Sequence, residues 1–370
     1  MKKTLLVTYF FPPAIGGIES YYLNLSANLP AADLVVLTQN NQTAEKFDSN
    51  QKYKIYRTDF FGGLMPPRWW PLKRQIGKII KEEGIKQLVF GHFHPLAVLG
   101  NYFGLPYFLF VHGTDVKQIK NNLWQKIIFK KVYKNCQKII ANSKYLAQEI
   151  NKIVGDKSKV EVVYPGVNYS VLQSQAELLL NKKQELVIKE DDLVMLSLGR
   201  LIKQKNFEAI IKSMPDLLKS FPNLKYVIAG DGPELGNLKD LTARLDLKSR
   251  VEFVGPVDNI DDNKKVYYQL ADLFVSVSNI GEGFGISYLE AQASGLSVIA
   301  SKFGGSAEAV IDRQTGILVE PDNLKQIKKA ISELLNDKQK RKTYGQAGRR
   351  LVRDKFNWSN QVDKIKEILK

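Results

Sequence analysis

Residues 272–300 read DLFVSVSNIGEGFGISYLEAQASGLSVIA. A short run of β-branched and aromatic residues, 272–277, leads into a glycine-rich turn, a helix-prone segment and a second apolar run, 297–300. Continuous apolar runs of this length, separated by helical segments, are typical of buried parallel strands that are joined by helices. The stretch therefore predicts a strand–helix–strand unit of an α/β fold.

The same alternation of apolar runs and helical segments continues along the whole chain. Candidate strands are 3–9, 33–38, 53–57, 86–91, 106–111, 137–141 and 159–164 in the first half, and 193–198, 224–229, 251–254, 272–277, 297–300 and 316–319 in the second. The series restarts after a polar, helix-prone connector at 171–192. We therefore predict two doubly wound parallel-sheet (Rossmann-like) domains, 1–170 and 193–355, that face a central cleft. The amphipathic helix 356–370 is expected to join the first domain.

Length and composition limit the class of protein. With 370 residues, of which 44% are hydrophobic, the chain is long enough for two buried cores. Its one cysteine, Cys136, excludes an intramolecular disulfide framework and favours a reducing compartment, so we expect a cytoplasmic protein. The N-terminus resembles a secretion signal, but its apolar run of about seven residues leads into prolines and glycines, so we interpret it as a strand. No apolar stretch is long enough to cross a bilayer.

Basic residues are concentrated in the first half of the chain. The net charge is +16, and residues 1–165 hold 23 of the 54 basic and 11 of the 38 acidic residues, which gives +12 there and +4 in the remainder. This bias predicts an anionic partner for the first domain: a membrane surface, a phosphorylated acceptor or a nucleic acid. A lysine-rich proteome is the alternative explanation.

Two loops that follow predicted strands carry groups suited to phosphates. The first contains adjacent Gly16 and Gly17 just before a predicted helix, whose N-terminal N–H groups are suited to phosphate oxygens. Its spacing is not G-x-G-x-x-G, so the dinucleotide fingerprint of dehydrogenases is missing, and a plain tight turn is the alternative. The second loop carries Arg200 and Lys205, either as fixed positive charge for a diphosphate leaving group or as a solvated basic loop.

The glycine-rich turn of the opening stretch lies between two carboxylates, at positions 282 and 290. Gly283 and Gly285 would expose backbone N–H groups at the positive end of the following helix, where phosphate oxygens bind well. Glu282, in the turn, is placed to meet sugar hydroxyls, and Glu290, about two turns into the helix, is placed to accept from ribose hydroxyls. Because Glu290 lies among small and apolar residues, it needs a partner if it is buried.

Taken together, these segments resemble a known family. Glu282 and Glu290, with Gly-Phe-Gly between them, are similar to the E-x7-E motif of retaining glycosyltransferase family four. Similar to the other landmarks of that family, and in the same order, are Gly16-Gly17, His112-Gly113-Thr114-Asp115, Arg200 with Lys205, and Gly230-Asp231-Gly232-Pro233. The resemblance covers nearly the whole chain. It implies the GT-B fold, with the nucleotide sugar bound mainly by the C-terminal domain and the acceptor placed against the N-terminal domain.

The resemblance also implies a role for each matching residue. The two basic residues would bind the diphosphate, the second glutamate the ribose, and the first glutamate and the backbone of the turn the transferred sugar. Gly17 would close over the phosphates, and His112 would lie near the anomeric carbon. In relatives that use GDP, a carboxylate near Asp258 reads guanine, which makes Asp258 a candidate base contact. The implied donor-binding residues are therefore Gly16, Gly17, Arg200, Lys205, Asp258, Glu282, Gly283, Phe284, Gly285 and Glu290.

Enzymes of this kind are thought to react on one face of the sugar, with a departing diphosphate oxygen helping to deprotonate the acceptor. Positioning and charge stabilisation would supply most of the rate. The sequence holds no Asp-x-Asp and only three histidines, so we expect neither a metal ion nor a cofactor besides the donor substrate. His92 and His94 alternate, but no third ligand lies nearby in the sequence, and we interpret them as part of a strand-end loop.

Two stretches of the basic half suggest contact with a membrane. Residues 66–81 couple two tryptophans to an amphipathic helix with a cationic face, which is typical of interfacial elements. Residues 117–138 carry seven lysines and no acidic residue. A solvated helix face is the alternative for both. The candidate membrane or acceptor contacts of the first stretch are Arg68, Trp69, Trp70, Lys73 and Arg74.

The segments 282–293 and 10–13 particularly resemble phosphatidylinositol mannosyltransferases. We therefore predict transfer of a hexose, with mannose from GDP-mannose as the first choice, to a lipid or glycan acceptor by an enzyme that is peripheral at the inner face of the cell membrane. Transfer from a UDP-sugar to a soluble or polysaccharide acceptor is the first alternative. A sugar-nucleotide epimerase of the same fold would leave the tryptophan- and lysine-rich surface unexplained, and a nucleic-acid-binding protein would make no use of the two glutamates.

Overall fold

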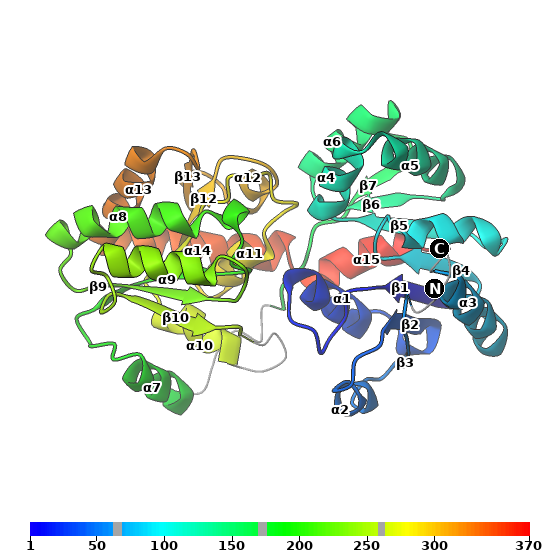
Figure 1. The fold of residues 1–370 in the computed structure, drawn as a ribbon, viewed down its shortest axis with the longest axis horizontal. Coiled ribbons are helices and arrows are strands. Elements are labelled where there is room, and N and C mark those ends of the chain that lie inside the picture. The colour runs from blue at the N-terminus through cyan, green and yellow to red at the C-terminus, as the bar shows by residue number, and fades with distance from the viewer. Residues whose placement is uncertain (62–68, 169–175, 258–262) are drawn as a thin grey trace. The chain divides into compact units, whose positions relative to one another are not determined.

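The computed structural model describes residues 1–61, 69–168, 176–257 and 263–370. The chain divides into two compact units (Figure 1). Unit 1 comprises residues 1–14, 18–165 and 358–370, and unit 2 comprises residues 15–17 and 166–357.

Unit 1 is built around a seven-stranded sheet in the order β3-β2-β1-β4-β5-β6-β7, with every pair parallel. Its strands are β1 (Thr4–Thr8), β2 (Leu34–Gln39), β3 (Lys54–Thr58), β4 (Gln87–Phe90), β5 (Tyr107–Val111), β6 (Ile139–Ala141) and β7 (Val160–Val162). Its α-helices are α1 (Gly17–Asn28), α2 (Glu45–Ser49), α3 (Trp70–Glu83), α4 (Gly113–Asn121), α5 (Leu123–Asn135), α6 (Lys144–Val154) and α15 (Trp358–Ile368).

Unit 2 is built around a six-stranded sheet in the order β10-β9-β8-β11-β12-β13, again with every pair parallel. Its strands are β8 (Leu193–Leu198), β9 (Leu224–Ala229), β10 (Val251–Gly255), β11 (Leu273–Ser276), β12 (Ser297–Ser301) and β13 (Gly316–Val319). Its α-helices are α7 (Ala176–Glu185), α8 (Phe207–Ser220), α9 (Leu235–Arg244), α10 (Asn263–Leu270), α11 (Ile286–Ala293), α12 (Ser306–Ala309), α13 (Leu324–Asn336) and α14 (Lys338–Lys355).

Each strand of the two sheets lies where the sequence predicts one, and the predicted pair of doubly wound parallel sheets is confirmed. Every residue of β1 and of β5 is buried. Helices on both faces of a parallel sheet exclude water from both sides of its inner strands, which is why these strands read as continuous apolar runs rather than as alternating ones.

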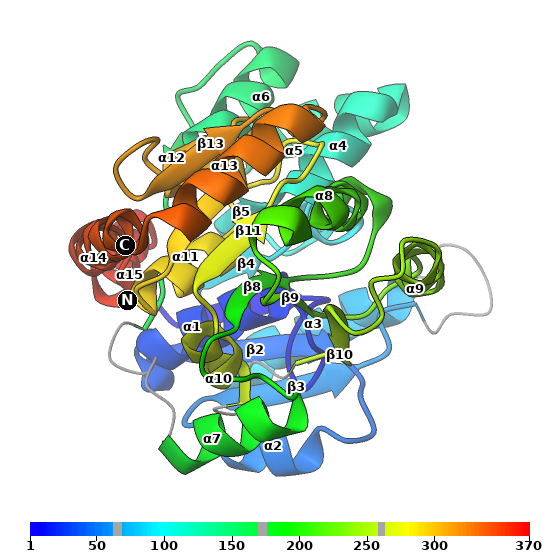
Figure 2. The same cartoon turned by 90° about the vertical axis from the view of Figure 1, so that its left-hand side faces the viewer.

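Both sheets reverse their strand order in the same way. In unit 1 the chain moves outward from β1 to β3 and then returns to place β4 on the other side of β1. In unit 2 it moves outward from β8 to β10 and returns with β11, which runs beside β8 (Figure 2). At such a switch point the loops after the two central strands leave in opposite directions and open a crevice at the carboxyl edge of the sheet. A ligand-binding site is therefore expected among these loops.

The C-terminal helix α15 packs into unit 1. Trp358 is fully buried, with its ring centre 5.3 Å from that of Tyr21. The Gln87 side-chain amide donates to the carbonyl oxygen of Leu369 at 2.9 Å. Val362, Ile365 and Leu369 are buried as well, so the apolar side of this C-terminal segment is shielded from water.

Candidate functional site

In unit 2 the loops after β8 and β11 meet at the switch point. Lys205, in a short 3-10 helix that follows β8, donates its ammonium to Oε1 of Glu282 at 2.8 Å. Both side chains are partly buried, where the attraction between opposite charges is stronger than in water. Arg200 lies in the same loop as Lys205 and is exposed. The structure therefore joins two residues that the resemblance assigns to the diphosphate and to the transferred sugar.

The basic loop after β8 is fixed by its neighbours. The Gln204 carbonyl oxygen accepts from the backbone N–H of Asn279 at 3.0 Å and from the Ser278 hydroxyl at 2.8 Å. Gly230, after β9, has a φ of 148°, and a Cβ there would lie only 2.0 Å from the carbonyl oxygen of Gly199. Only glycine allows this close approach. The glycine-rich segment after β9 therefore acts as a support for the loop that carries the two basic residues.

The glycine-rich turn leads directly into α11. Gly285 is the N-cap residue with a φ of 90°, and a Cβ there would lie 2.4 Å from the Tyr288 ring. The first N–H groups of a helix have no acceptor within the helix, so the start of α11 offers donors to an anion. Phe284 is buried, and its ring centre lies 5.4 Å from that of Phe356. The side chain of Phe284 thus anchors the turn.

A second glycine pair, which sequence reasoning missed, supports the turn from the other side. The backbone N–H of Gly305 donates to the Glu282 carbonyl at 2.9 Å, and a Cβ on Gly305 would lie 2.2 Å from the carbonyl oxygen of Gly283. A Cβ on Gly304 would lie 2.5 Å from Cα of Gly281. The available signal was two adjacent glycines in the loop that follows the predicted strand 297–300.

Glu290 has partners that the sequence did not reveal. Its Oε1 accepts from the Lys264 ammonium at 2.6 Å and its Oε2 from the Tyr268 hydroxyl at 2.7 Å, both from α10. Because α11 begins at Ile286, Glu290 lies only about one turn into the helix, not two as predicted. The expected need for a partner is thus met within the chain. Each carboxylate oxygen can still accept a second hydrogen bond.

In unit 1, His112 lies at the carboxyl end of β5 and is buried. Its Nε2 lies 2.8 Å from the Tyr22 hydroxyl, and that hydroxyl lies 2.6 Å from the carbonyl oxygen of Gly91. The carbonyl can only accept, so Tyr22 donates its single proton to it, and Nε2 must carry the imidazole proton. Burial lowers the pKa of His112 to about 4. The ring is therefore neutral at neutral pH, with Nδ1 left as an acceptor.

Asp115, the last residue of the His-Gly-Thr-Asp segment, holds this arrangement together. Its Oδ2 accepts from the backbone N–H of His112 at 2.9 Å, and its Oδ1 accepts from the backbone N–H of Phe93 at 3.2 Å. Burial raises the pKa of Asp115 to about 7, against the effect of these two hydrogen bonds. The carboxyl group thereby ties the loop after β4 to the loop after β5.

His92 lies beside His112, although the sequence suggested only a strand-end loop. It is buried, and neither ring nitrogen has a hydrogen-bond partner among the residues that the structure describes. Its ring centre lies 5.5 Å from that of His112 and 4.5 Å from that of Phe10. Burial, with a smaller contribution from His112, lowers the pKa of His92 to about 2. A buried imidazole without partners is costly, because its lost hydrogen bonds to water are not replaced.

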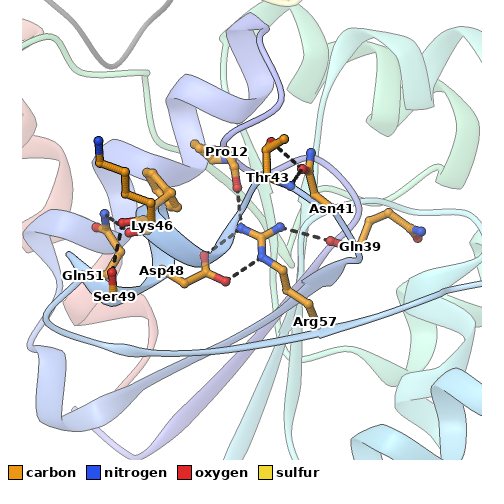
Figure 3. Close-up of polar contacts among 10 residues, drawn as sticks. Pro12, Gln39, Asn41, Thr43, Lys46, Asp48, Ser49, Gln51 and Arg57 are labelled. Atoms are coloured by element: carbon orange, nitrogen blue, oxygen red, sulfur yellow. Dashed lines mark hydrogen bonds and ion pairs between the residues drawn. The ribbon is translucent and has the colours of Figure 1, made fainter.

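The loop between β1 and α1 is held by Arg57 of β3. The guanidinium of Arg57 forms two hydrogen bonds with Asp48, at 2.7 and 2.8 Å, and donates to the carbonyl oxygen of Pro12 at 2.6 Å (Figure 3). The glycine pair follows in this loop, and α1 begins at Gly17. A Cβ on Gly17 would meet no atom within 4 Å, so packing within the chain does not demand glycine there.

The residues of α3 divide between the core and the surface of unit 1. Leu72, Ile76 and Ile79 are buried in the core of unit 1, and Trp69 packs against that core, whereas Trp70 is 45% exposed. The ammonium of Lys73 lies 4.9 Å from the Trp70 ring, and the guanidinium carbon of Arg74 lies 6.0 Å from it. The helix is amphipathic as predicted, but its apolar face is occupied by the core.

Two predicted residues, Arg68 and Asp258, lie outside the described residues. Within the part of the chain that is described, no group of three or more His, Cys, Asp or Glu residues could hold a metal ion. No helix there is long and apolar enough to cross a membrane.

Comparison with known proteins identifies the family of these segments. The family described as "Glycosyltransferase Family 4" matches residues 15–171, and "Glycosyl transferases group 1" matches residues 180–351. An uncharacterized glycosyltransferase of Methanocaldococcus jannaschii is 30% identical over 391 residues, covering 100% of this chain and 98% of the relative.

Two further proteins are similar over their full length. A GDP-mannose-dependent monoacylated alpha-(1-6)-phosphatidylinositol monomannoside mannosyltransferase of Corynebacterium glutamicum is 27% identical over 386 residues, which are 100% of this chain and 98% of that protein. The crystal structure of HepE from Anabaena, in complex with UDP and glucose, superimposes with a TM-score of 0.86 at 19% identity, over 100% of this chain and 99% of the other. The second likeness concerns the fold alone.

Proposed function

The chain belongs to glycosyltransferase family 4, with the two Rossmann-like domains of the GT-B fold, and we propose that it is a retaining, metal-independent hexosyltransferase. Its donor is a nucleoside diphosphate sugar, and its acceptor is a lipid or a glycan. The observation that carries this proposal is the ion pair between Lys205 and Glu282 at the switch point of unit 2, in the same loop region as the exposed Arg200.

The basic loop supplies the charge that the leaving group needs. Negative charge builds on the diphosphate as the bond to the anomeric carbon breaks. One of the three N–H groups of Lys205 donates to Glu282, which leaves two for phosphate oxygens, and Arg200 adds up to five donors. The ion pair holds the ammonium in place before the donor arrives, so little reorganisation is required during the reaction. The second oxygen of Glu282 remains for a sugar hydroxyl.

The reaction itself exchanges two bonds at one carbon. The acceptor oxygen forms a bond to the anomeric carbon on the face from which the diphosphate leaves, and the bond between that carbon and the diphosphate oxygen breaks. The acceptor hydroxyl proton passes to the departing diphosphate oxygen. Configuration is retained, and no covalent enzyme intermediate is needed.

For His112, in unit 1, we propose a role near the anomeric carbon of the sugar. The sugar carries partial positive charge in the transition state of glycosyl transfer. A charged imidazolium nearby would oppose that charge, whereas the neutral ring enforced by burial and by Tyr22 does not. Its Nδ1 is suited to accept from a hydroxyl group. We propose that the neighbouring His92 contacts the acceptor. A hydroxyl group of the acceptor would form a hydrogen bond with a ring nitrogen of His92, neither of which has a partner among the described residues.

GDP-mannose is the first donor to test, since relatives that match the whole chain are named for it. Glu290 would accept from the ribose and Asp258 would contact the base. A UDP-sugar is the second choice, because HepE, with the same fold, binds UDP-glucose. A lipid acceptor fits both the names of the mannosyltransferase relatives and the basic character of residues 1–165. We propose that the protein is peripheral at the inner face of the cell membrane.

Thermal unfolding in the presence of GDP-mannose, UDP-glucose and ADP-glucose tests the donor. A ligand that binds only the folded chain stabilises it by about 2.7 kcal/mol at a concentration of 100 Kd, so the correct donor raises Tm by several degrees. If none of the three raises Tm, the proposed function is wrong. Incubation of the best donor without acceptor distinguishes an epimerase, which would still convert the sugar.

A further inference from the structure

Three large apolar side chains are exposed together at the start of α5. Trp124 is 75% exposed, Leu123 72% and Ile127 53%. Among the large apolar side chains that the structure describes, Trp124 and Leu123 are the two most exposed. Single exposed apolar residues are common on proteins, but a contiguous group marks a surface that contacts something apolar.

The orientation of α5 is fixed by its other face. Phe129, Val132 and Tyr133 are buried in unit 1, so the helix cannot turn its exposed side inward. At 3.6 residues per turn, positions 123, 127, 130 and 134 follow one another along the exposed side. The apolar residues therefore occupy the first turns of that side, and lysines follow them along the same line.

The lysines around this apolar group are not neutralised. Lys120 of α4 is paired with Glu149 at 2.5 Å. By contrast, in the part of the chain that the structure describes, no carboxylate pairs with Lys117 of α4 or with four lysines of α5, which are Lys126, Lys130, Lys131 and Lys134. The α5 surface is defined here as these five lysines together with Leu123, Trp124 and Ile127.

We propose that the α5 surface docks the enzyme on an anionic membrane, with Leu123, Trp124 and Ile127 inserted at the headgroup level and the lysines on lipid phosphates. This inference rests on the proposed lipid acceptor and names the element that reaches it. Aliphatic side chains beside a tryptophan match the boundary between headgroups and acyl chains, and unpaired lysines match anionic headgroups. Nucleic-acid backbones would use the lysines but not the aliphatic residues. The apolar face of α3 lies in the core and is not available for this contact.

Vesicle binding by the full chain tests the proposal. The vesicles contain roughly three parts phosphatidylcholine to one part phosphatidylglycerol, with phosphatidylcholine alone as the comparison. We expect co-sedimentation with the anionic vesicles that falls at least roughly tenfold when the salt concentration is raised from 0.05 to 0.5 M, because surface charges are screened. The double change Trp124→Ser/Ile127→Ser and the double change Lys130→Glu/Lys134→Glu should each lower the partition coefficient by about tenfold or more.

Matched variants separate this surface from a general effect of exposed residues. Trp124→Phe keeps the apolar contact, so binding should persist while the blue shift of tryptophan fluorescence on vesicle addition is reduced. Trp70→Ser, on α3, and Leu180→Ser, on α7, remove exposed apolar side chains elsewhere and should leave binding unchanged. Since all these side chains are exposed, an unchanged Tm verifies that each variant is folded.

The proposal is overturned if the wild-type chain ignores anionic vesicles at low salt, or if Trp70→Ser abolishes binding and Trp124→Ser/Ile127→Ser does not. It is also overturned if the chain is a dimer that dissociates on the Trp124→Ser/Ile127→Ser change, since the surface would then bind a second copy. If vesicle binding fails but a donor still raises Tm, the proposed transferase function stands. The docking surface and the transferase function can therefore be judged separately.

Discussion

Arg200 is exposed at the end of β8 and contributes little to folding, yet we place it on the diphosphate. Arg200→Ala should therefore lower turnover strongly while leaving Tm within about 1 °C of the wild type. Loss of one charge-assisted contact in the transition state costs about 2–4 kcal/mol, which corresponds to a loss of roughly 30- to 1,000-fold in kcat. Product formation and thermal unfolding should be measured side by side. Arg244→Ala, which removes an exposed arginine of α9, is the control and should be nearly silent.

Near-normal turnover in a folded Arg200→Ala protein would contradict the placement of Arg200 on the diphosphate.

The same comparison of turnover and stability for Glu290 requires a more conservative variant. Removing its carboxylate takes one hydrogen-bond acceptor away from the partly buried Lys264 and one from the buried Tyr268, so Glu290→Ala is expected to lose stability as well as activity. Glu290→Gln keeps an acceptor for Tyr268 and is the better probe of a role in donor binding.

His92 makes the stability of the folded chain sensitive to acid. Its pKa of about 2 in the folded state is far below the usual 6.5, so between pH 6.5 and pH 2 the unfolded chain takes up a proton that the folded chain does not. The free energy of unfolding therefore falls as pH decreases, by about 1.4 kcal/mol per pH unit for this one group. His112, with a pKa of about 4, acts in the same direction, and Asp115, with a pKa of about 7, acts in the opposite one.

Because the effects of His112 and Asp115 largely offset each other between pH 4.5 and 6, the effect of His92 should be visible there. We expect His92→Phe to reduce the loss of stability over this window by about 2 kcal/mol. Urea unfolding at several pH values measures the slope. His94→Phe changes an exposed histidine two residues away and should alter the slope much less. An unchanged slope in His92→Phe would mean that His92 is protonated in the folded chain.

Helix α15 closes the core of unit 1, although it follows unit 2 in the sequence. Trp358, at its start, is fully buried against Tyr21, so Trp358→Ala should lower the free energy of unfolding by about 3–5 kcal/mol. Trp124→Ala removes the same side chain from an exposed position and should change it by less than about 0.5 kcal/mol. Chemical unfolding of both variants provides the test. Similar stabilities would contradict the burial of α15.

Helices α3 and α5 illustrate why an amphipathic pattern does not identify a surface. Both helices carry apolar residues and lysines at helical spacing. In α3 the apolar residues complete the core of unit 1, whereas three apolar residues of α5 remain in contact with water. The sequence pattern of α3 looked more like a membrane element because two adjacent tryptophans, Trp69 and Trp70, lie at its start. Packing against the sheet buried the apolar face of α3 and left the three apolar residues of α5 exposed.

The reaction of the complete enzyme should need no divalent metal and should retain the anomeric configuration of the donor. The reason is that Arg200 and Lys205 supply the positive charge that a metal ion would otherwise provide at the diphosphate. We expect full activity in the presence of EDTA and a product whose linkage, read by NMR, has the configuration of the donor. An inverted product, or activity that EDTA abolishes and Mg²⁺ or Mn²⁺ restores, would contradict the mechanism.

The sequence by itself determined the strands, the parallel arrangement of both sheets and the loops in which a site must lie. Each of these follows from local features: apolar runs of a given length, helical periodicity between them, and glycines directly after strands. The glycine-rich turn before α11 is an example, because its glycines lie between a predicted strand and a predicted helix.

Only the tertiary structure decided which side chains meet. Lys205 and Glu282 are 77 residues apart in the sequence, and Tyr22 and His112 are 90 apart. The partners of Glu290, the unpartnered state of His92 and the burial of the apolar face of α3 likewise arise between elements that are distant in the chain. Such contacts depend on how the helices pack on the sheets. The residue pattern of one helix or strand does not predict which side chains of other elements will contact it.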